Sequence, residues 1–178
     1  MKSTVKISIE DITLSDCQCI VNAANENLLP GGGVCGAIFR RAGYDQLDRA
    51  CRKIGFCETG RAVITPGFNL KSQYIIHTPG PVWRGGNSGE RDLLYSCYKS
   101  ALALCVENDI NSISFPLISS GIFGYPLREA WQTALLSVTD FFRENPQHKI
   151  DVKFCVLEKS VADLGRSILE EIQKNTLT

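Results

Sequence analysis

The chain has 178 residues, of which 44% are hydrophobic and 21% charged, as in ordinary soluble globular proteins. This length is enough for one domain with its own core, so we expect residues 1–178 to form a single domain. Nineteen Lys and Arg residues balance nineteen Asp and Glu residues. A net charge of zero argues against broad electrostatic binding of nucleic acid or of an anionic membrane, so any anionic ligand has to be held locally.

No apolar run approaches the roughly 18 residues that span a bilayer. The N-terminus, MKSTVKISIEDI, alternates polar and apolar residues and lacks the apolar core of a signal peptide, so we expect a cytoplasmic protein. The eight cysteines form no C-x-x-C pair, and five of them lie in apolar periodic segments: Cys17, Cys19, Cys97, Cys105 and Cys155. This pattern favours buried, reduced thiols over disulfides or a zinc site, and we expect no metal.

Six segments have the apolar or alternating pattern of β-strands. They are residues 4–10, 19–24, 61–67, 74–80, 113–119 and 150–157. Helices are predicted between them, beginning near Gly33, Asn87, Pro126 and Ser160. The second and fourth carry an acidic residue three positions after the predicted cap, Glu90 and Asp163, which is typical of a capping box.

Strands that alternate with helices predict an α/β fold of three layers, with a central, mostly parallel sheet covered on both faces. The strands at residues 61–67 and 74–80 follow each other closely, which suggests antiparallel pairing and therefore a mixed sheet. In such sheets ligands bind in the crevice beyond the carboxyl ends of the strands.

A glycine-rich stretch follows the strand at residues 19–24. Gly31, Gly33 and Gly36 match the spacing G-x-G-x-x-G, but residues 22–30 separate them from the strand, whereas the dinucleotide fingerprint needs glycine at the strand's end. No Gly-Lys-Ser/Thr follows, which excludes a P-loop. The stretch feeds the helix that begins near Gly33, whose free N–H groups and dipole can hold an anion without a cationic side chain.

A second stretch, SSGIFGYP at residues 119–126, repeats this order of strand, hydroxyls, glycines and helix start. Two such loops at corresponding strand ends can clamp a diphosphate between them. Turns and helix caps alone are the better explanation of a single glycine cluster. Two clusters beside Asn22 and Asn25 favour the ligand site.

Four motifs occur in the order and at the spacing of the macrodomain family of ADP-ribose-binding modules and ADP-ribosyl hydrolases: VNAAN, GGGV-C-GAI, HTPGPVW and SSGIFGYP. The chain resembles this family over nearly its whole length, and most of all the MacroD-type branch. Members of that branch remove ADP-ribose from acidic side chains and deacetylate O-acetyl-ADP-ribose. The resemblance implies a macrodomain fold, ADP-ribose and mono-ADP-ribosylated proteins as partners, no cofactor, and a monomer.

The resemblance also implies roles for residues around the distal ribose. Asn25 hydrogen-bonds that ribose and helps to order the attacking water, Phe123 packs against the ribose, and Asn22 and Ala23 line the pocket floor. A purely structural role stays open for both asparagines, because asparagine side chains also cap local turns.

At the adenine end, the resemblance implies that Asp11 accepts a hydrogen bond from the exocyclic amine beside the backbone of Ile12, and that Leu157 borders the ring. Asp11 can also cap a turn or helix, and the two roles are compatible. The family usually has glycine where Glu10 stands. The residues that match the two phosphate loops are Gly32, Gly33, Val34, Ala37 and Ile38, and Ser119, Ser120, Gly121, Ile122, Phe123, Gly124 and Tyr125.

Cys35 stands where MacroD-type hydrolases commonly carry an aspartate that activates water. A thiol with a pKa of about 8.5 is mostly neutral at pH 7, although the first turn of a helix can lower that value. We interpret Cys35 as a neutral pocket residue, with a base or a nucleophile as the alternatives. His77 could pair with it, but a structural histidine is favoured because the sequence offers no evident carboxylate to orient the ring.

Two functions from different classes follow. In the first, the chain hydrolyses ADP-ribosyl esters with a water that the bound diphosphate polarises, while Asn25 and the loop of Phe123 position the ribose. In the second, it is a reader that binds the modification and releases it unchanged. A third hypothesis, regulation of RNA processing by direct protein contact, rests on the resemblance to bacterial relatives alone.

Overall fold

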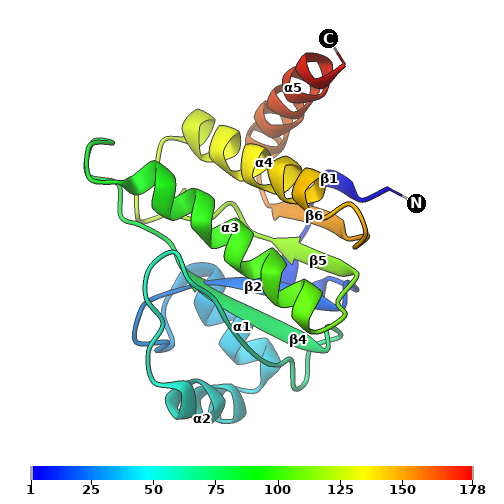
Figure 1. The fold of residues 1–178 in the computed structure, drawn as a ribbon. Helices are drawn as coiled ribbons and strands as arrows, with labels where there is room; N and C mark the ends of the chain where they lie inside the picture. Colours follow the sequence, from blue (N-terminus) through cyan, green and yellow to red (C-terminus); the bar gives the residue numbers. More distant parts are fainter. Residues whose placement is uncertain (1, 178) are drawn as a thin grey trace.

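The computed structural model describes residues 2–177, which form a six-stranded sheet with helices on both faces (Figure 1). The strands are β1 (Thr4–Ile9), β2 (Cys19–Ala24), β3 (Val63–Pro66), β4 (Tyr74–Pro79), β5 (Ser112–Phe115) and β6 (Asp151–Val156). Their order across the sheet is β1-β6-β5-β2-β4-β3. The predicted three-layer α/β fold is confirmed.

The sheet is mixed, as predicted. β3 and β4 are antiparallel, with Val63 opposite His77 and Pro66 opposite Tyr74, because the short connection at residues 67–73 turns the chain straight back. All other neighbouring strands are parallel. The carboxyl ends of β1, β6, β5, β2 and β4 therefore meet at one edge of the sheet.

The helices are α1 (Gly33–Ala42), α2 (Tyr44–Ile54), α3 (Glu90–Glu107), α4 (Leu127–Glu144) and α5 (Lys159–Thr176), with a 3-10 turn, η1 (Ile12–Leu14). The helices α3, α4 and α5 cover one face of the sheet, and α1 and α2 cover the other (Figure 1). Successive strand residues point to opposite faces, so Val21 joins the core under α3 and α4 while Ile20 joins the core under α1.

Helix α2 is absent from the sequence prediction. Its sequence, YDQLDRACRKI, is mostly polar, but Leu47 and Cys51 lie four residues apart and form a narrow apolar stripe that is buried. It starts directly after Gly43, whose φ of 111° ends α1 and redirects the chain. This spacing is a helical signal that the sequence prediction did not use, and packing of the stripe against the core stabilises the helix.

Both predicted capping boxes are wrong, although the helices they open are present. Helix α3 begins after Gly89, not after Asn87, and Glu90 accepts hydrogen bonds from the preceding loop instead of closing a box. Helix α5 begins at Lys159 without a side-chain cap, and Asp163 pairs with Lys159 on the same helix. In both cases the acidic side chain has found another partner.

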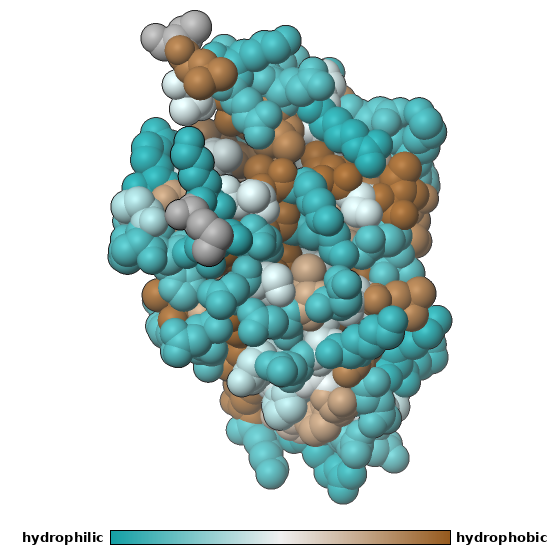
Figure 2. Space-filling view, turned by 90° about the vertical axis from the view of Figure 1, so that its right-hand side faces the viewer, coloured by the Kyte–Doolittle hydropathy of each residue, from teal (hydrophilic) through white to brown (hydrophobic). Residues whose placement is uncertain are grey.

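All eight cysteines are free thiols, and all but Cys17 are buried. They behave as small apolar core residues. Residues 2–177 contain no cluster of three His, Cys, Asp or Glu side chains placed to hold a metal ion. Across this same range, no helix combines the length and the hydrophobicity that crossing a membrane requires. On the face shown in Figure 2, hydrophilic side chains surround the apolar ones.

Candidate functional site

Four loops meet at the edge where the parallel strands end. Turn η1 follows β1, the first glycine loop (residues 31–36) follows β2, the second glycine loop (residues 119–125) follows β5, and the β4–α3 loop (residues 80–89) follows β4. The strand order places them across the sheet as η1, second glycine loop, first glycine loop and β4–α3 loop. This edge is the crevice where the sequence analysis places the ligand.

The first glycine loop ends in the N-terminus of α1, which Gly32 caps without a side-chain hydrogen bond. Gly33 has a φ of 57°, which strains any residue with a side chain. A Cβ at Gly36 would lie 2.5 Å from the carbonyl oxygen of Gly31, so the loop closes tightly only with glycine there. The N–H groups of Gly33 and Val34 lie in the first helical turn and have no intrahelical partner, so they can bind an anion.

The second glycine loop also offers unpaired backbone donors. Ser119 has a left-handed φ of 67°, and the Tyr125 N–H donates to the Ser119 carbonyl at 2.9 Å, which closes the turn. Between them, the N–H groups of Gly121, Ile122 and Phe123 make no hydrogen bond within the described residues. Successive free amides of this kind form an anion-binding concavity.

Asn25 and Phe123 line one pocket of about 470 Å³. Asn25 follows β2 and Phe123 lies on the second glycine loop, so the fold unites two residues that are far apart in sequence. The Phe123 carbonyl accepts a hydrogen bond from the Trp83 N–H at 2.8 Å, which ties the second glycine loop to the β4–α3 loop. The volume is typical of small-molecule sites.

The side chain of Asn25 also holds its own loop. Its Oδ1 accepts a hydrogen bond from the Leu29 N–H at 2.9 Å, and its Nδ2 donates to the Leu29 carbonyl at 2.8 Å. This is the turn-capping role that the sequence analysis left open. It leaves the second Nδ2 hydrogen for a ligand, and it fixes the orientation of the amide.

Asn22 and His77 form a buried pair on the neighbouring strands β2 and β4. Asn22 Nδ2 lies 3.1 Å from His77 Nδ1, and Thr65 Oγ1 lies 2.9 Å from His77 Nε2. Burial lowers the pKa of His77 to about 4, so the ring is neutral at pH 7. The thiol near this ring, 4.0 Å from Nε2, belongs to Cys51 and not to Cys35. His77 is therefore a core histidine, as the sequence analysis favours.

Cys35 lies in the first turn of α1 with its thiol turned into the core between α1 and the sheet, and it is 9% exposed. Its Sγ is 3.9 Å from the Leu29 carbonyl oxygen. Burial raises the pKa of this thiol, which is therefore neutral at pH 7. The helix N-terminus, which can lower a thiol pKa, does not outweigh the effect of burial. Cys35 is not among the residues that line the 470 Å³ pocket.

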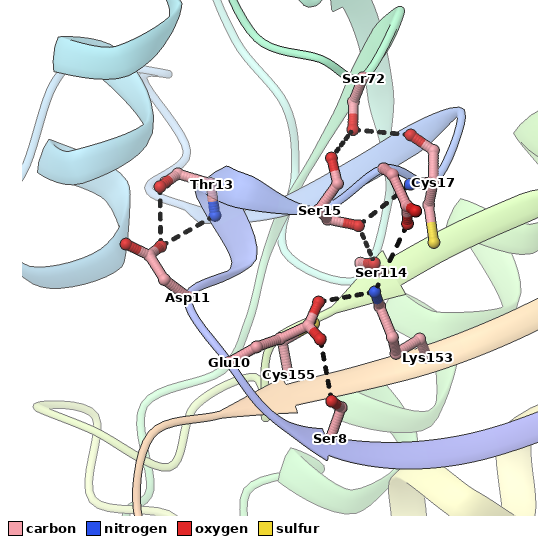
Figure 3. A network of polar contacts seen from close by, with 11 residues as sticks. Ser8, Glu10, Asp11, Thr13, Ser15, Cys17, Ser72, Ser114, Lys153 and Cys155 are labelled. Carbon is pink, nitrogen blue, oxygen red and sulfur yellow. Dashed lines mark hydrogen bonds and ion pairs between the residues drawn. The ribbon is translucent and has the colours of Figure 1, made fainter.

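At the other end of the crevice, Asp11 caps η1. Its Oδ1 accepts hydrogen bonds from the Thr13 hydroxyl at 2.7 Å and from the Thr13 N–H at 2.9 Å (Figure 3), and the hydroxyl contributes most to lowering the pKa of Asp11. Glu10 turns toward β6 and forms an ion pair with Lys153 at 2.6 Å, on the side of the chain away from Asp11 (Figure 3). Leu157 follows β6 at the same edge and is exposed.

Comparison with known proteins agrees with this architecture. The sequence model of the macro domain family, described as "Macro domain", matches residues 21–134. The chain belongs to this family. The "O-acetyl-ADP-ribose deacetylase" of Cronobacter sakazakii is 46% identical over 84% of this chain and 84% of its own length. The "ADP-ribose glycohydrolase MACROD2" of Xenopus laevis is 50% identical over 82% of this chain but only 35% of its own length.

A solved structure is similar over almost the whole macrodomain. The Oceanobacillus iheyensis macrodomain with ADP superposes with a TM-score of 0.93 at 38% identity, covering 98% of this chain and 94% of that one. Likeness at this level confirms that the sheet, its helices and the loops at the carboxyl edge form a macrodomain fold.

The other predicted site residues of this macrodomain differ in exposure. Five are buried: Ile12, Asn22, Ile38, Ser119 and Tyr125. Ten are half-buried or exposed: Ala23, Gly32, Gly33, Val34, Ala37, Ser120, Gly121, Ile122, Gly124 and Leu157. Whether each contacts a ligand stays a prediction.

The sequence analysis did not predict that the β4–α3 loop of the macrodomain lines the pocket. The carboxylate of Glu90 accepts hydrogen bonds from three backbone N–H groups of this loop, those of Arg84 at 3.0 Å, Gly86 at 2.7 Å and Ser88 at 2.6 Å. These bonds, first that of Arg84, lower the pKa of Glu90 to about 2. The available signal was a glycine-rich loop directly before an acidic helix start, which the prediction interpreted as a cap.

Proposed function

We propose that this macrodomain binds ADP-ribose and hydrolyses ADP-ribosyl ester bonds, both of mono-ADP-ribosylated Asp and Glu side chains and of O-acetyl-ADP-ribose. The observation that carries the proposal is the shared pocket of Asn25 and Phe123 beside two loops of unpaired backbone amides. The names of the relatives, a deacetylase and a glycohydrolase, support a hydrolase. The solved macrodomain with ADP supports a site for the ADP part.

In this proposal the ligand lies across the carboxyl edge of the sheet. The adenine amine donates to Asp11, whose second carboxylate oxygen is unused within residues 2–177. The diphosphate lies between the two glycine loops and accepts hydrogen bonds from the N–H groups of Gly33 and Val34 and of Gly121 to Phe123. The distal ribose contacts Asn25 and Phe123.

The chemistry is the addition of water across the ester bond. The diphosphate polarises a water held between the glycine loops, and Asn25 and Phe123 hold the ribose so that this water reaches the ester. Water supplies OH to the acyl side and a proton to the ribose oxygen, which gives a free carboxylic acid and ADP-ribose. No protein base is needed, which suits a neutral thiol at Cys35.

The second candidate is a reader that binds ADP-ribose and releases it unchanged. One observation favours it: the position of the usual aspartate holds a buried thiol with a raised pKa, which cannot act as a base at pH 7.

The deciding experiment offers the protein O-acetyl-ADP-ribose and proteins ADP-ribosylated on glutamate, serine or arginine, and records which substrates lose the modification. We expect loss from glutamate and from the acetyl ester. Asn25→Ala should lower the rate about 100-fold because the ribose and its water lose their positioning group. Asn108→Ala, the same change at an exposed cap at the end of α3, should not.

Gly33→Glu should abolish binding of ADP-ribose itself, through the bulk and charge of the new side chain against the diphosphate. Calorimetry with ADP-ribose separates the two candidates. Tight binding without loss of any modification would establish the reader instead.

A further inference from the structure

The pocket of Asn25 and Phe123 lies on the β4 side of the carboxyl edge of the sheet. Asp11 lies at the end of β1, the second glycine loop at the end of β5, and Asn25 at the end of β2. The pocket continues past Asn25 to the end of β4, where the β4–α3 loop forms its outer wall. Under the proposed function, adenine lies toward β1, so the β4 side is where the group attached to the distal ribose leaves the crevice.

This outer wall has a fixed shape. The three bonds to Glu90 hold the backbone of the β4–α3 loop, and Glu90 itself is 2% exposed. The ring of Trp83 packs 4.7 Å from that of Tyr125, and the backbone N–H of Trp83 donates to the Phe123 carbonyl at 2.8 Å. The wall is therefore joined to the second glycine loop, and the side chains it presents are held next to the distal ribose.

Three charged residues line the pocket, and only one of them lacks a partner among residues 2–177. Glu26 accepts hydrogen bonds from the N–H of Thr59 at 3.0 Å and from its hydroxyl at 3.1 Å. Glu90 is bonded to the loop backbone. The guanidinium of Arg84 makes no hydrogen bond or ion pair with any residue that the structure describes. A free guanidinium at a pocket rim is suited to a carboxylate, which it binds with two parallel hydrogen bonds.

We propose that the β4 side of this pocket is a subsite for the modified protein, in which Arg84 binds an acidic side chain next to the ADP-ribosylated residue. The inference rests on the proposed function for the orientation of ADP-ribose. It names the substrate class more narrowly: proteins modified within acidic segments. Thr59 and Ser88, which also line the pocket, offer further polar contacts to the backbone of such a segment.

The test uses two synthetic peptides that carry ADP-ribose on the same glutamate, one flanked by aspartates and the other by asparagines. The wild-type protein should have about a fivefold higher kcat/KM for the aspartate peptide, the size expected of a partly exposed charge pair. Arg84→Ala should bring this ratio close to one, and Arg84→Lys should give an intermediate ratio because the charge remains without the planar fork. Arg49→Ala, which removes an exposed arginine of α2 outside the pocket, should keep the fivefold preference.

Equal kcat/KM values for the two peptides in the wild-type protein, or an unchanged preference in Arg84→Ala, would overturn the inference. If neither peptide loses ADP-ribose, the same ratio is measured in dissociation constants. A fivefold preference in affinity that Arg84→Ala removes would then support the subsite, while the lack of turnover would contradict the proposed hydrolase.

Discussion

The thiol of Cys35 has the surroundings of a core residue. It packs between α1 and the sheet, its pKa is raised by burial, and the pocket that holds Asn25 and Phe123 does not include it. A thiolate at this place would lack a cationic partner and would be close to the bound diphosphate, both of which disfavour ionisation. This supports the interpretation of Cys35 as a neutral residue that does not transfer a proton at pH 7.

We therefore expect Cys35→Ala to keep ester hydrolysis within about tenfold of the wild-type rate, a barrier change of roughly 1.4 kcal/mol or less, because Asn25 and the diphosphate remain. Initial rates on O-acetyl-ADP-ribose measure this. A nucleophilic cysteine would instead leave a covalent ADP-ribosyl adduct visible by mass spectrometry, and a base would give a rate that rises with pH as the thiol ionises. If Cys35→Ala lowers the rate of hydrolysis by more than about a hundredfold with unchanged ADP-ribose affinity, the thiol takes part in the chemical step.

Among the elements, the β4–α3 loop has a conformation that a single side chain, that of Glu90, holds in place. Its glycines allow three N–H groups to converge on the Glu90 carboxylate, an arrangement that replaces a helix cap. The pKa of Glu90 is about 2 in the folded chain, against an ordinary value of 4.5. A depressed carboxyl pKa stabilises the fold above the unfolded value, and the stabilisation is lost as the pH falls from about 4.5 toward 2.

Glu90→Gln should consequently lower the free energy of unfolding at pH 7, and the difference from the wild-type protein should shrink as the pH falls through this window. Urea unfolding at a series of pH values measures the difference. Glu107→Gln, the same change at an exposed residue at the end of α3, is the control and should have little effect. A difference that does not change between pH 7 and pH 3 would show that the charge of Glu90 plays no part.

For the whole molecule, a net charge of zero and phosphate loops lined by backbone N–H groups determine how strongly ligand binding depends on salt. Counterion release is large only where many lysines or arginines neutralise phosphates. Here the charge of the ligand meets amide dipoles and a helix terminus, whose effect is short-ranged.

Binding of ADP-ribose should therefore weaken by no more than about threefold between roughly 50 and 500 mM salt. Calorimetry at several salt concentrations gives the slope, with a lysine-rich nucleotide-binding protein as the reference. A steep loss of affinity would show that cationic side chains, and not backbone amides, hold the diphosphate.

The sequence alone determined the features that depend on residues close together in the chain. Strand and helix periodicity predicted the six strands and four of the five helices, because most of these bury apolar residues at regular spacing. Glycines after strands predicted the two loops at the carboxyl edge, because a tight turn into a helix leaves backbone N–H groups free.

Only the tertiary structure decided what depends on partners distant in sequence. His77 bonds to Asn22, 55 residues away, and the Phe123 carbonyl bonds to Trp83, so neither the role of the histidine nor the wall of the pocket can be found from a local pattern. Packing against a core that other segments build also stabilises helix α2, which buries Leu47 and Cys51. Side-chain direction and burial arise from packing of the whole sheet and its helices, which is why the environment of Cys35 and the free guanidinium of Arg84 became visible only in the folded chain.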